Sequence, residues 1–130
     1  CIDCDFTDAS RCVNNSGWWS PEGPGRWSVQ RQSSFMLFTT PGAKKLELNF
    51  YAALQRTVHL LVNETQCAVC EINGSQSISA TVPSDVVGGG KLSIELQIEE
   101  ELYSPKALGI GKDTRTLGVY LTHVKSTPIV

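Results

Sequence analysis

The sequence lacks several features that mark common classes of protein. No stretch approaches the roughly eighteen consecutive apolar residues of a membrane-spanning helix, so we expect no membrane insertion by this chain. Its 11 lysines and arginines are scattered and are outnumbered by 13 acidic residues, which argues against nucleic-acid binding. No segment shows an apolar stripe of helical period, and internal repeats and low-complexity tracts are missing too. What remains is a folded domain spanning residues 1–130.

Motifs of catalysis are also missing. The chain has no G-x-S-x-G nucleophile turn, no H-E-x-x-H metal motif and no glycine-rich phosphate loop. Glu22 and Asp113 are a conceivable carboxylate pair for glycoside hydrolysis, but neighbouring arginines would keep both ionised and so remove the general acid. His59 is expected to be solvated or packed at an edge. We therefore expect no catalytic residue, no bound metal and no cofactor.

Alternation of apolar and polar residues with a period of two dominates the chain. Strand-like runs cover 33–40, 44–52, 56–63, 77–82, 91–99 and 117–124. The last run is apolar on both faces, which is typical of a strand in the middle of a sheet. Turn-forming residues separate the runs at Asn73-Gly74, at 83–85 and at 88–90. Short strands at this spacing predict an all-β sandwich or barrel.

Five cysteines lie in two groups, three of them in a cysteine-rich segment at 1–16. We expect a structural role for four: Cys4, Cys12, Cys67 and Cys70. Disulfides in an oxidising compartment are the favoured form, while a split zinc site and unpaired thiols stay open. Because the chain begins with Cys1 and its only methionine is Met36, we expect a processed form or a piece of a longer protein.

Two segments interrupt the strand pattern. The segment 17–28, GWWSPEGPGRWS, holds all three tryptophans between glycines and prolines, and we expect neither a regular strand nor a helix there. The segment 103–118 is a long loop before the last strand. Long ordered loops in compact domains usually carry function or are held by their own contacts.

The first of these segments resembles a known motif. Gly17-Trp18, Pro21-Glu22 and 25–28 resemble the opening motif of accessory domains attached to bacterial membrane phosphoglycerol transferases and to surface-polysaccharide glycosyltransferases. This chain departs from the motif in Trp19, in its cysteine-rich start and in a missing acidic-glycine turn after Ser28.

The second segment resembles the closing motif of the same domains through Ser104-Pro105, Leu108-Gly109 and 113–118. Between the motifs, Val62-Asn63-Glu64 approximates a turn of the family. The resemblance covers about residues 14–126 and implies a jelly-roll-like antiparallel β-sandwich, a single domain similar to carbohydrate-binding modules.

The resemblance implies a non-catalytic carbohydrate-binding or substrate-positioning module of an enzyme that synthesises or modifies bacterial surface glycans. Its partners would be a surface carbohydrate and the catalytic domain of the parent protein. Its location would be extracytoplasmic, periplasmic or at the cell surface, within a larger membrane-associated protein. A structural or assembly domain without glycan binding is the first alternative, and a small glycan hydrolase is the second.

The two loops supply the predicted ligand-binding residues: Trp18, Trp19, Glu22, Arg26, Asp113 and Arg115. An exposed tryptophan ring can stack on the apolar face of a sugar, so we expect Trp18 or Trp19 to be exposed. The charged residues either contact the glycan or form salt bridges that tie the loops together, and both are possible at once. Trp27 is expected to be mostly buried, with Trp27→Ala costing about 3 kcal/mol or more.

Overall fold

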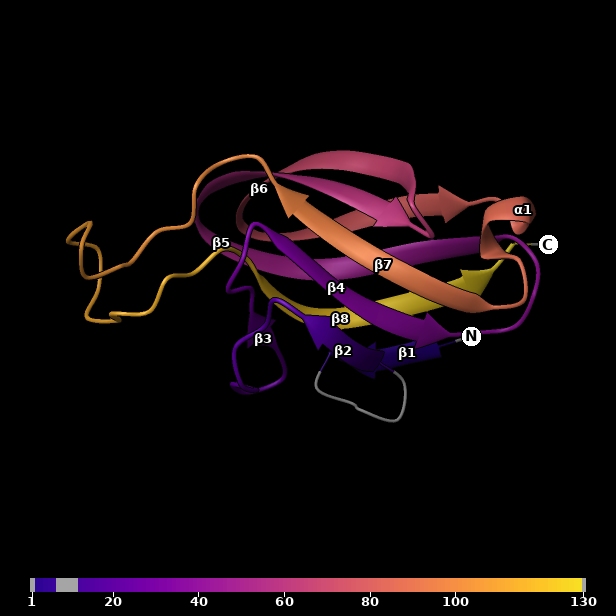
Figure 1. Ribbon diagram of the computed structural model, residues 1–130, viewed down its shortest axis with the longest axis horizontal. Helices are drawn as coiled ribbons and strands as arrows, with labels where there is room; N and C mark the ends of the chain where they lie inside the picture. Colours follow the sequence, from indigo (N-terminus) through magenta and orange to yellow (C-terminus); the bar gives the residue numbers. More distant parts are fainter. Residues whose placement is uncertain (1, 7–11, 130) are drawn as a thin grey trace.

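The computed structural model describes residues 2–6 and 12–129, and its regular secondary structure is almost entirely β-strand (Figure 1). In chain order the elements are β1 (Ile2–Asp5), β2 (Cys12–Ser16), β3 (Arg26–Trp27), β4 (Gln32–Phe38), β5 (Lys44–Val62), β6 (Thr65–Val82), α1 (Ser84–Val87), β7 (Lys91–Ile98) and β8 (Tyr120–Pro128).

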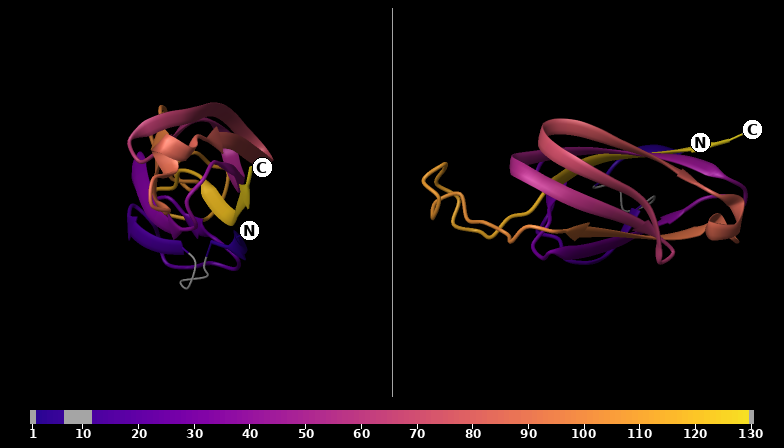
Figure 2. Two further views of the ribbon diagram at one scale, coloured as in Figure 1. Left: turned by 90° about the vertical axis from the view of Figure 1, so that its right-hand side faces the viewer. Right: turned by 90° about the horizontal axis from the view of Figure 1, so that it is seen from above.

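All neighbouring strands are antiparallel, in the order β1-β8-β5-β7-β4-β2, with β3 beside β8 and β6 beside β5. The 19-residue strand β5 links the two layers. Its first part, 44–51, pairs with β8, and its last part, 58–62, pairs with β7. The register shifts between Ala52 and Arg56, and such an irregularity bends a strand. The predicted jelly-roll-like antiparallel β-sandwich is therefore confirmed, with β6 following β5 along its length (Figure 2).

The core lies between the layers and is built from alternate residues of each strand. In β7 the side chains of Leu92, Ile94, Leu96 and Ile98 are buried, while those between them remain at least partly exposed. On β5, Leu46, Leu48 and Phe50 point inward in the same way. These are the positions that the period-two pattern predicts, because successive side chains of a strand face opposite sides of the sheet.

The structure differs from the sequence prediction at the turns. The runs 44–52 and 56–63 form one strand, and Asn73-Gly74 lies inside β6 instead of closing a hairpin. Gly74 stands opposite Ala52, at the irregularity where the two long strands bend together. The hairpin turn is at Asn63 and Glu64, with φ values of 48° and 71°.

The segment 17–28 also contradicts our expectation, because part of it is strand. Arg26 and Trp27 form β3 against β8, and Trp18 is bridged to Ser28. Proline and glycine made the segment look irregular, but pairing with an existing strand supplies the hydrogen bonds that a short strand cannot provide for itself.

The disulfide interpretation is wrong for Cys67 and Cys70, which are both free thiols. They are half-buried on β6 and pack against the core, so their contribution is to packing. The side chains of Cys4 and Cys12 lie outside the described residues. Within the described part of the chain, no group of three or more metal-ligating side chains is close enough to hold a metal ion.

Candidate functional site

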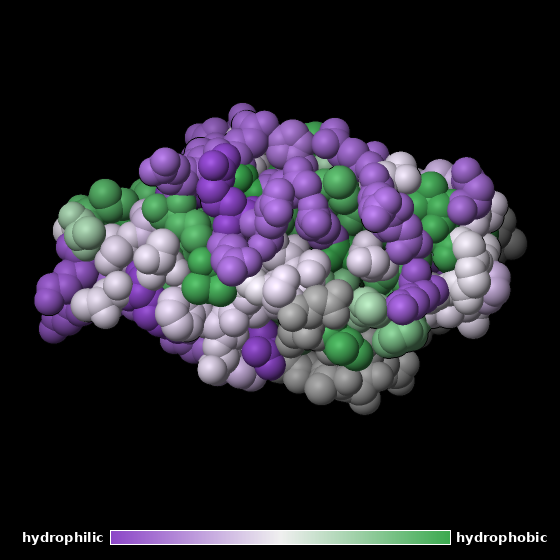
Figure 3. Space-filling model, in the orientation of Figure 1, coloured by the Kyte–Doolittle hydropathy of each residue, from purple (hydrophilic) through white to green (hydrophobic). Residues whose placement is uncertain are grey.

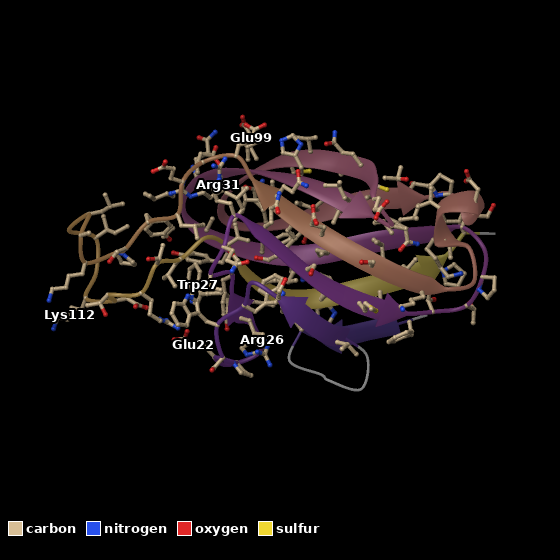
Figure 4. The ribbon with its side chains drawn as sticks, viewed as in Figure 1. Glu22, Arg26, Trp27, Arg31, Glu99 and Lys112 are labelled. Atoms are coloured by element: carbon tan, nitrogen blue, oxygen red, sulfur yellow. The ribbon has the colours of Figure 1, made fainter. Side chains whose placement is uncertain are left out.

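The two loops singled out from the sequence lie side by side at one end of the sandwich. Arg115 in the second loop joins them, because its Nη2 lies 3.0 Å from Oε2 of Glu22 in the first. Figure 4 shows Glu22, Arg26 and Trp27 at the end of the domain from which the long loop projects. We call Glu22, Asp113 and Arg115 the charge cluster.

Arg115 binds Asp113 through two nitrogens. Its Nε lies 3.1 Å from both carboxylate oxygens and its Nη2 lies 2.7 Å from Oδ2, while the backbone N–H of Arg115 donates to Oδ1. These hydrogen bonds lower the pKa of Asp113, and the same contact raises the pKa of Arg115. Both groups therefore stay charged around neutral pH, and the charge cluster is a salt-bridged tie between the loops.

Trp19 is held between the two loops. Its Nε1 donates to the carbonyl oxygen of Thr116 at 2.9 Å, and the Arg115 guanidinium lies over the ring, 5.8 Å from the centroid. Arg26 donates from Nη1 to the carbonyl oxygen of Trp19 at 3.2 Å. Arg26 thus braces the backbone of its own loop, and its buried Nε has no hydrogen-bond partner among the described residues. The half-buried Trp19 ring is held in one orientation.

Trp18 has a structural role, although we predicted it as a ligand-binding residue. Its ring packs edge to face on Phe6 at 4.6 Å and near Phe35 at 6.3 Å, both fully buried. Its Nε1 donates to the carbonyl oxygen of Ser34 at 2.9 Å. Trp18 and Trp19 point to opposite sides because they are neighbours in an extended segment. Trp18 therefore closes this end of the core.

Trp27 is only partly exposed, as expected, but it lies on the outer face of the sheet and not in the core. It stands opposite Tyr120 on β8, which in turn stands opposite Tyr51 on β5. The next residue of β8, Leu121, faces the core, so Tyr120 and its neighbours in register face outward. The Trp27 ring lies 5.2 Å from that of Tyr120 and 6.1 Å from that of Tyr51.

We call Trp27, Tyr51 and Tyr120 the aromatic row. Sequence reasoning missed both tyrosines. The signal for Tyr51 was present, because it occupies an outward position in the alternating run 44–52, and 41% of it is exposed. Only the pairing of β3 with β8 and of β8 with β5 shows that three aromatic residues, distant in the sequence, share one register line.

The aromatic row and the charge cluster form a continuous surface. The hydroxyl of Tyr120 donates a short hydrogen bond to the carbonyl oxygen of Glu22. The turn from Glu22 to Gly25, closed by two backbone hydrogen bonds, thus lies against the edge of the row. The candidate site combines aromatic rings on a sheet with charged side chains on two loops.

Away from the candidate site, the surface has a hollow beside strands β4, β5 and β7. It measures about 500 Å3 and is lined by Gln30, Arg31, Gln32, His59, Gln97, Ile98 and Glu99. Figure 4 shows Arg31 and Glu99 close together there. His59 contacts Gln66 through Nδ1 at 3.0 Å and Glu99 through Nε2 at 2.6 Å, and these hydrogen bonds raise the pKa of His59. The hollow is mostly polar, and its lining contains no tryptophan, tyrosine or phenylalanine.

No protein-family model and no curated protein matches this chain. Solved structures of carbohydrate-binding modules, however, have a similar fold. A family 35 carbohydrate-binding module from an environmental isolate aligns over 98% of this chain and 93% of its own, with 11% identity and a TM-score of 0.61. The CBM36-1 domain of a multidomain xylanase from the hindgut metagenome of Trinervitermes trinervoides aligns over 99% and 98%, with 12% identity and a TM-score of 0.57.

A third similar structure is the carbohydrate-binding module CBM36 in complex with calcium and xylotriose. It aligns over 98% of this chain and 100% of its own, with 10% identity and a TM-score of 0.53. Similarity at such low identity establishes the β-sandwich fold of this chain. Among the described residues, no helix is long and apolar enough to cross a membrane.

Proposed function

We propose that this chain is a non-catalytic carbohydrate-binding module whose ligand surface is the aromatic row together with Trp19. The observation that carries the proposal is the alignment of Trp27, Tyr120 and Tyr51 in register on an outer sheet face, where Tyr51 is exposed and the other two are partly exposed. Partly exposed rings present flat apolar faces to the C–H groups of a sugar ring. The similarity of the fold to carbohydrate-binding modules supports the same conclusion.

The charge cluster supports binding in preference to hydrolysis. A glycoside hydrolase needs one carboxyl group that is protonated and can act as a general acid. Asp113 has a lowered pKa because Arg115 donates hydrogen bonds to it, so its carboxyl group is ionised when the sandwich is folded. Glu22 is bonded to the same guanidinium, and 55% of its side chain is exposed. Its remaining lone pairs are available to accept hydrogen bonds from sugar hydroxyls.

Calcium, which the similar CBM36 structure holds, does not fit the charge cluster here. Glu22 and Asp113, the carboxylates of the charge cluster, both contact Arg115, whose single positive charge offsets one of their two negative charges and occupies oxygens that a cation would need. We therefore propose that glycan binding at this surface is independent of divalent cations. The affinity for the oligosaccharide should be the same in EDTA as in calcium chloride, and a loss of binding in EDTA would contradict this.

The wider context rests on the motif resemblance of segments 17–28 and 103–118. We propose that the parent protein is a bacterial phosphoglycerol transferase or glycosyltransferase, that the module acts outside the cytoplasm, and that the ligand is a surface glycan. The sequence of the full-length gene product tests this directly. A parent chain without such a catalytic region would contradict the proposed context, but it would not bear on the proposed binding surface.

The binding proposal is tested by isothermal titration with xylotriose, with other neutral oligosaccharides and with a glycerol-phosphate-substituted bacterial polysaccharide. Tyr51→Ala and Trp19→Ala should each weaken binding by about 1–3 kcal/mol, as loss of aromatic stacking does for other flat ligands. Phe38→Ala is the matched control, because Phe38 is an aromatic residue that is 51% exposed but lies at the last position of β4, away from the candidate site. Unchanged affinity in both site variants would refute the proposed surface.

An assembly domain without glycan binding is the alternative that such a refutation would favour. The described residues offer one observation for it: the salt-bridged loops and braced Trp19 form a rigid surface, which suits protein contact as well. If no glycan in the panel binds at millimolar concentration, this alternative gains support. A titration against the isolated catalytic region of the parent protein would then be the next measurement.

A further inference from the structure

The long loop between β7 and β8 ends in an exposed apolar tip. Its apex, 106–112, reads KALGIGK, and every one of these residues is exposed. Leu108 is 53% exposed and Ile110 is 52% exposed, more than any other large apolar side chain in the described part of the chain. Figures 1 and 2 show this loop projecting well beyond the body of the sandwich. We call 106–112 the tip.

The tip has a defined shape, although it projects. Backbone N–H groups of Leu108, Gly109 and Ile110 donate to carbonyl oxygens of Ser104, Lys106 and Pro105, at 3.1, 3.1 and 3.0 Å respectively. The N–H of Lys106 donates to the carbonyl oxygen of Asp113 at 2.9 Å and closes the base. Four of the seven backbone N–H groups of the tip are therefore satisfied within the loop, which lowers the cost of moving the apex into a less polar medium.

The charge of the tip is positive, in a chain whose net charge is −2. Lys106 and Lys112 bracket five residues that carry no polar side chain. The nearest acidic residue of the loop, Asp113, is already paired with Arg115. Figure 4 shows Lys112 pointing away from the sandwich, and Figure 3 shows apolar surface beside hydrophilic surface at this projecting end.

We propose that the tip docks on an anionic lipid surface, with Leu108 and Ile110 entering the interfacial layer and the two lysines contacting the headgroups. Lysines suit this task because their long stems can lie along apolar surface while the ammonium groups remain with the phosphates. A protein partner fits less well. Protein interfaces are centred on Trp, Tyr and Arg side chains, and the tip contains none of them.

The proposal departs from our sequence-based expectation of no membrane insertion. It concerns shallow contact by two side chains, not a membrane span. Because the charge cluster is at the base of the same loop, docking would hold the candidate glycan site close to the surface of the bilayer. The proposal does not rest on glycan binding, since it uses only residues of the tip.

Vesicle flotation of the full chain tests it, with phosphatidylcholine vesicles that either contain or lack phosphatidylserine. The chain should float only with vesicles that contain phosphatidylserine, and added salt should reduce the bound fraction. Lys112→Gln should lower the partition coefficient about fivefold, as expected for one lysine near an anionic surface. The double variant Leu108→Ser/Ile110→Ser should also lower it several-fold, because it removes the inserted apolar groups.

Phe38→Ser and Lys91→Gln are the matched controls. Both residues are exposed, stand opposite each other in register, and lie at the end of the sandwich away from the tip. Neither control should change the partition coefficient. No binding to either vesicle would overturn the proposal and would make a protein partner the better occupant. Binding that depends on the lysines but not on Leu108 and Ile110 would overturn the insertion of the tip. Titration of the tip variants with xylotriose shows whether a change in vesicle binding is accompanied by a change in glycan binding.

Discussion

The tryptophans of the first loop divide into two kinds, and their removal should have different costs. Trp18→Ala removes a ring that closes the core against Phe6 and Phe35 and that donates a hydrogen bond to Ser34. Trp27→Ala removes a ring from the outer face, where it contacts Tyr51 and Tyr120. We therefore expect Trp18→Ala to destabilise the chain more than Trp27→Ala, the reverse of what the sequence suggests.

The magnitude follows from these contacts. Truncating a large aromatic side chain in a core costs about 3–5 kcal/mol. Because Trp18 keeps part of its surface exposed, we expect the lower end of that range, about 3 kcal/mol, including about 1 kcal/mol for the lost hydrogen bond. Trp27 loses two aromatic contacts worth about 0.5–1.5 kcal/mol each, and its site refills with water, so we expect about 1–2 kcal/mol.

Urea unfolding monitored by far-ultraviolet circular dichroism measures the difference, since tryptophan fluorescence changes with the substitutions themselves. The free energy of unfolding should fall by about 1–2 kcal/mol more for Trp18→Ala than for Trp27→Ala, which is the difference between the two costs above. Phe38→Ala serves as a control for an exposed aromatic residue. Equal costs, or a larger cost for Trp27→Ala, would refute the assignment of Trp18 to the core and of Trp27 to the surface.

Three further predictions concern single contacts. Arg115→Ala should lower the free energy of unfolding more than Lys45→Ala does, because the Lys45–Glu47 ion pair is exposed and such pairs contribute about 0–1 kcal/mol. Equal losses in urea titrations would mean that Arg115 does not tie the two loops together. Glu64→Gly should raise the melting temperature, with a gain of about 0.5–1 kcal/mol, because φ at Glu64 is 71° and glycine adopts it without strain; a lower melting temperature would contradict this. The raised pKa of His59 means that its contribution to stability is fully present below pH 6.5 and is lost as pH rises through the folded-state pKa. His59→Gln should therefore cost more stability at acidic than at alkaline pH in parallel denaturations, and a pH-independent cost would show that Glu99 does not pair with the charged ring.

The sequence alone determined the class of fold and most of the core. A period-two pattern depends only on the geometry of a strand, in which alternate side chains face opposite sides. The pattern in 91–99 therefore identified Leu92, Ile94 and Leu96 as buried without knowledge of the partner strands. The two motif segments were also visible, and the contact between Glu22 and Arg115 brings them together as their charges suggested.

Only the tertiary structure decided which tryptophan faces the core and which faces outward. Trp18 and Trp27 lie in the same segment, 17–28, and have similar neighbours in the sequence, so local pattern does not separate them. The direction of Trp27 is set by its register with Tyr120, and Tyr120 is 93 residues further along the chain. Register between distant strands depends on hydrogen bonding across the whole sheet. For that reason the aromatic row could not be predicted from the sequence, although the sequence gives the identity of each of its three residues.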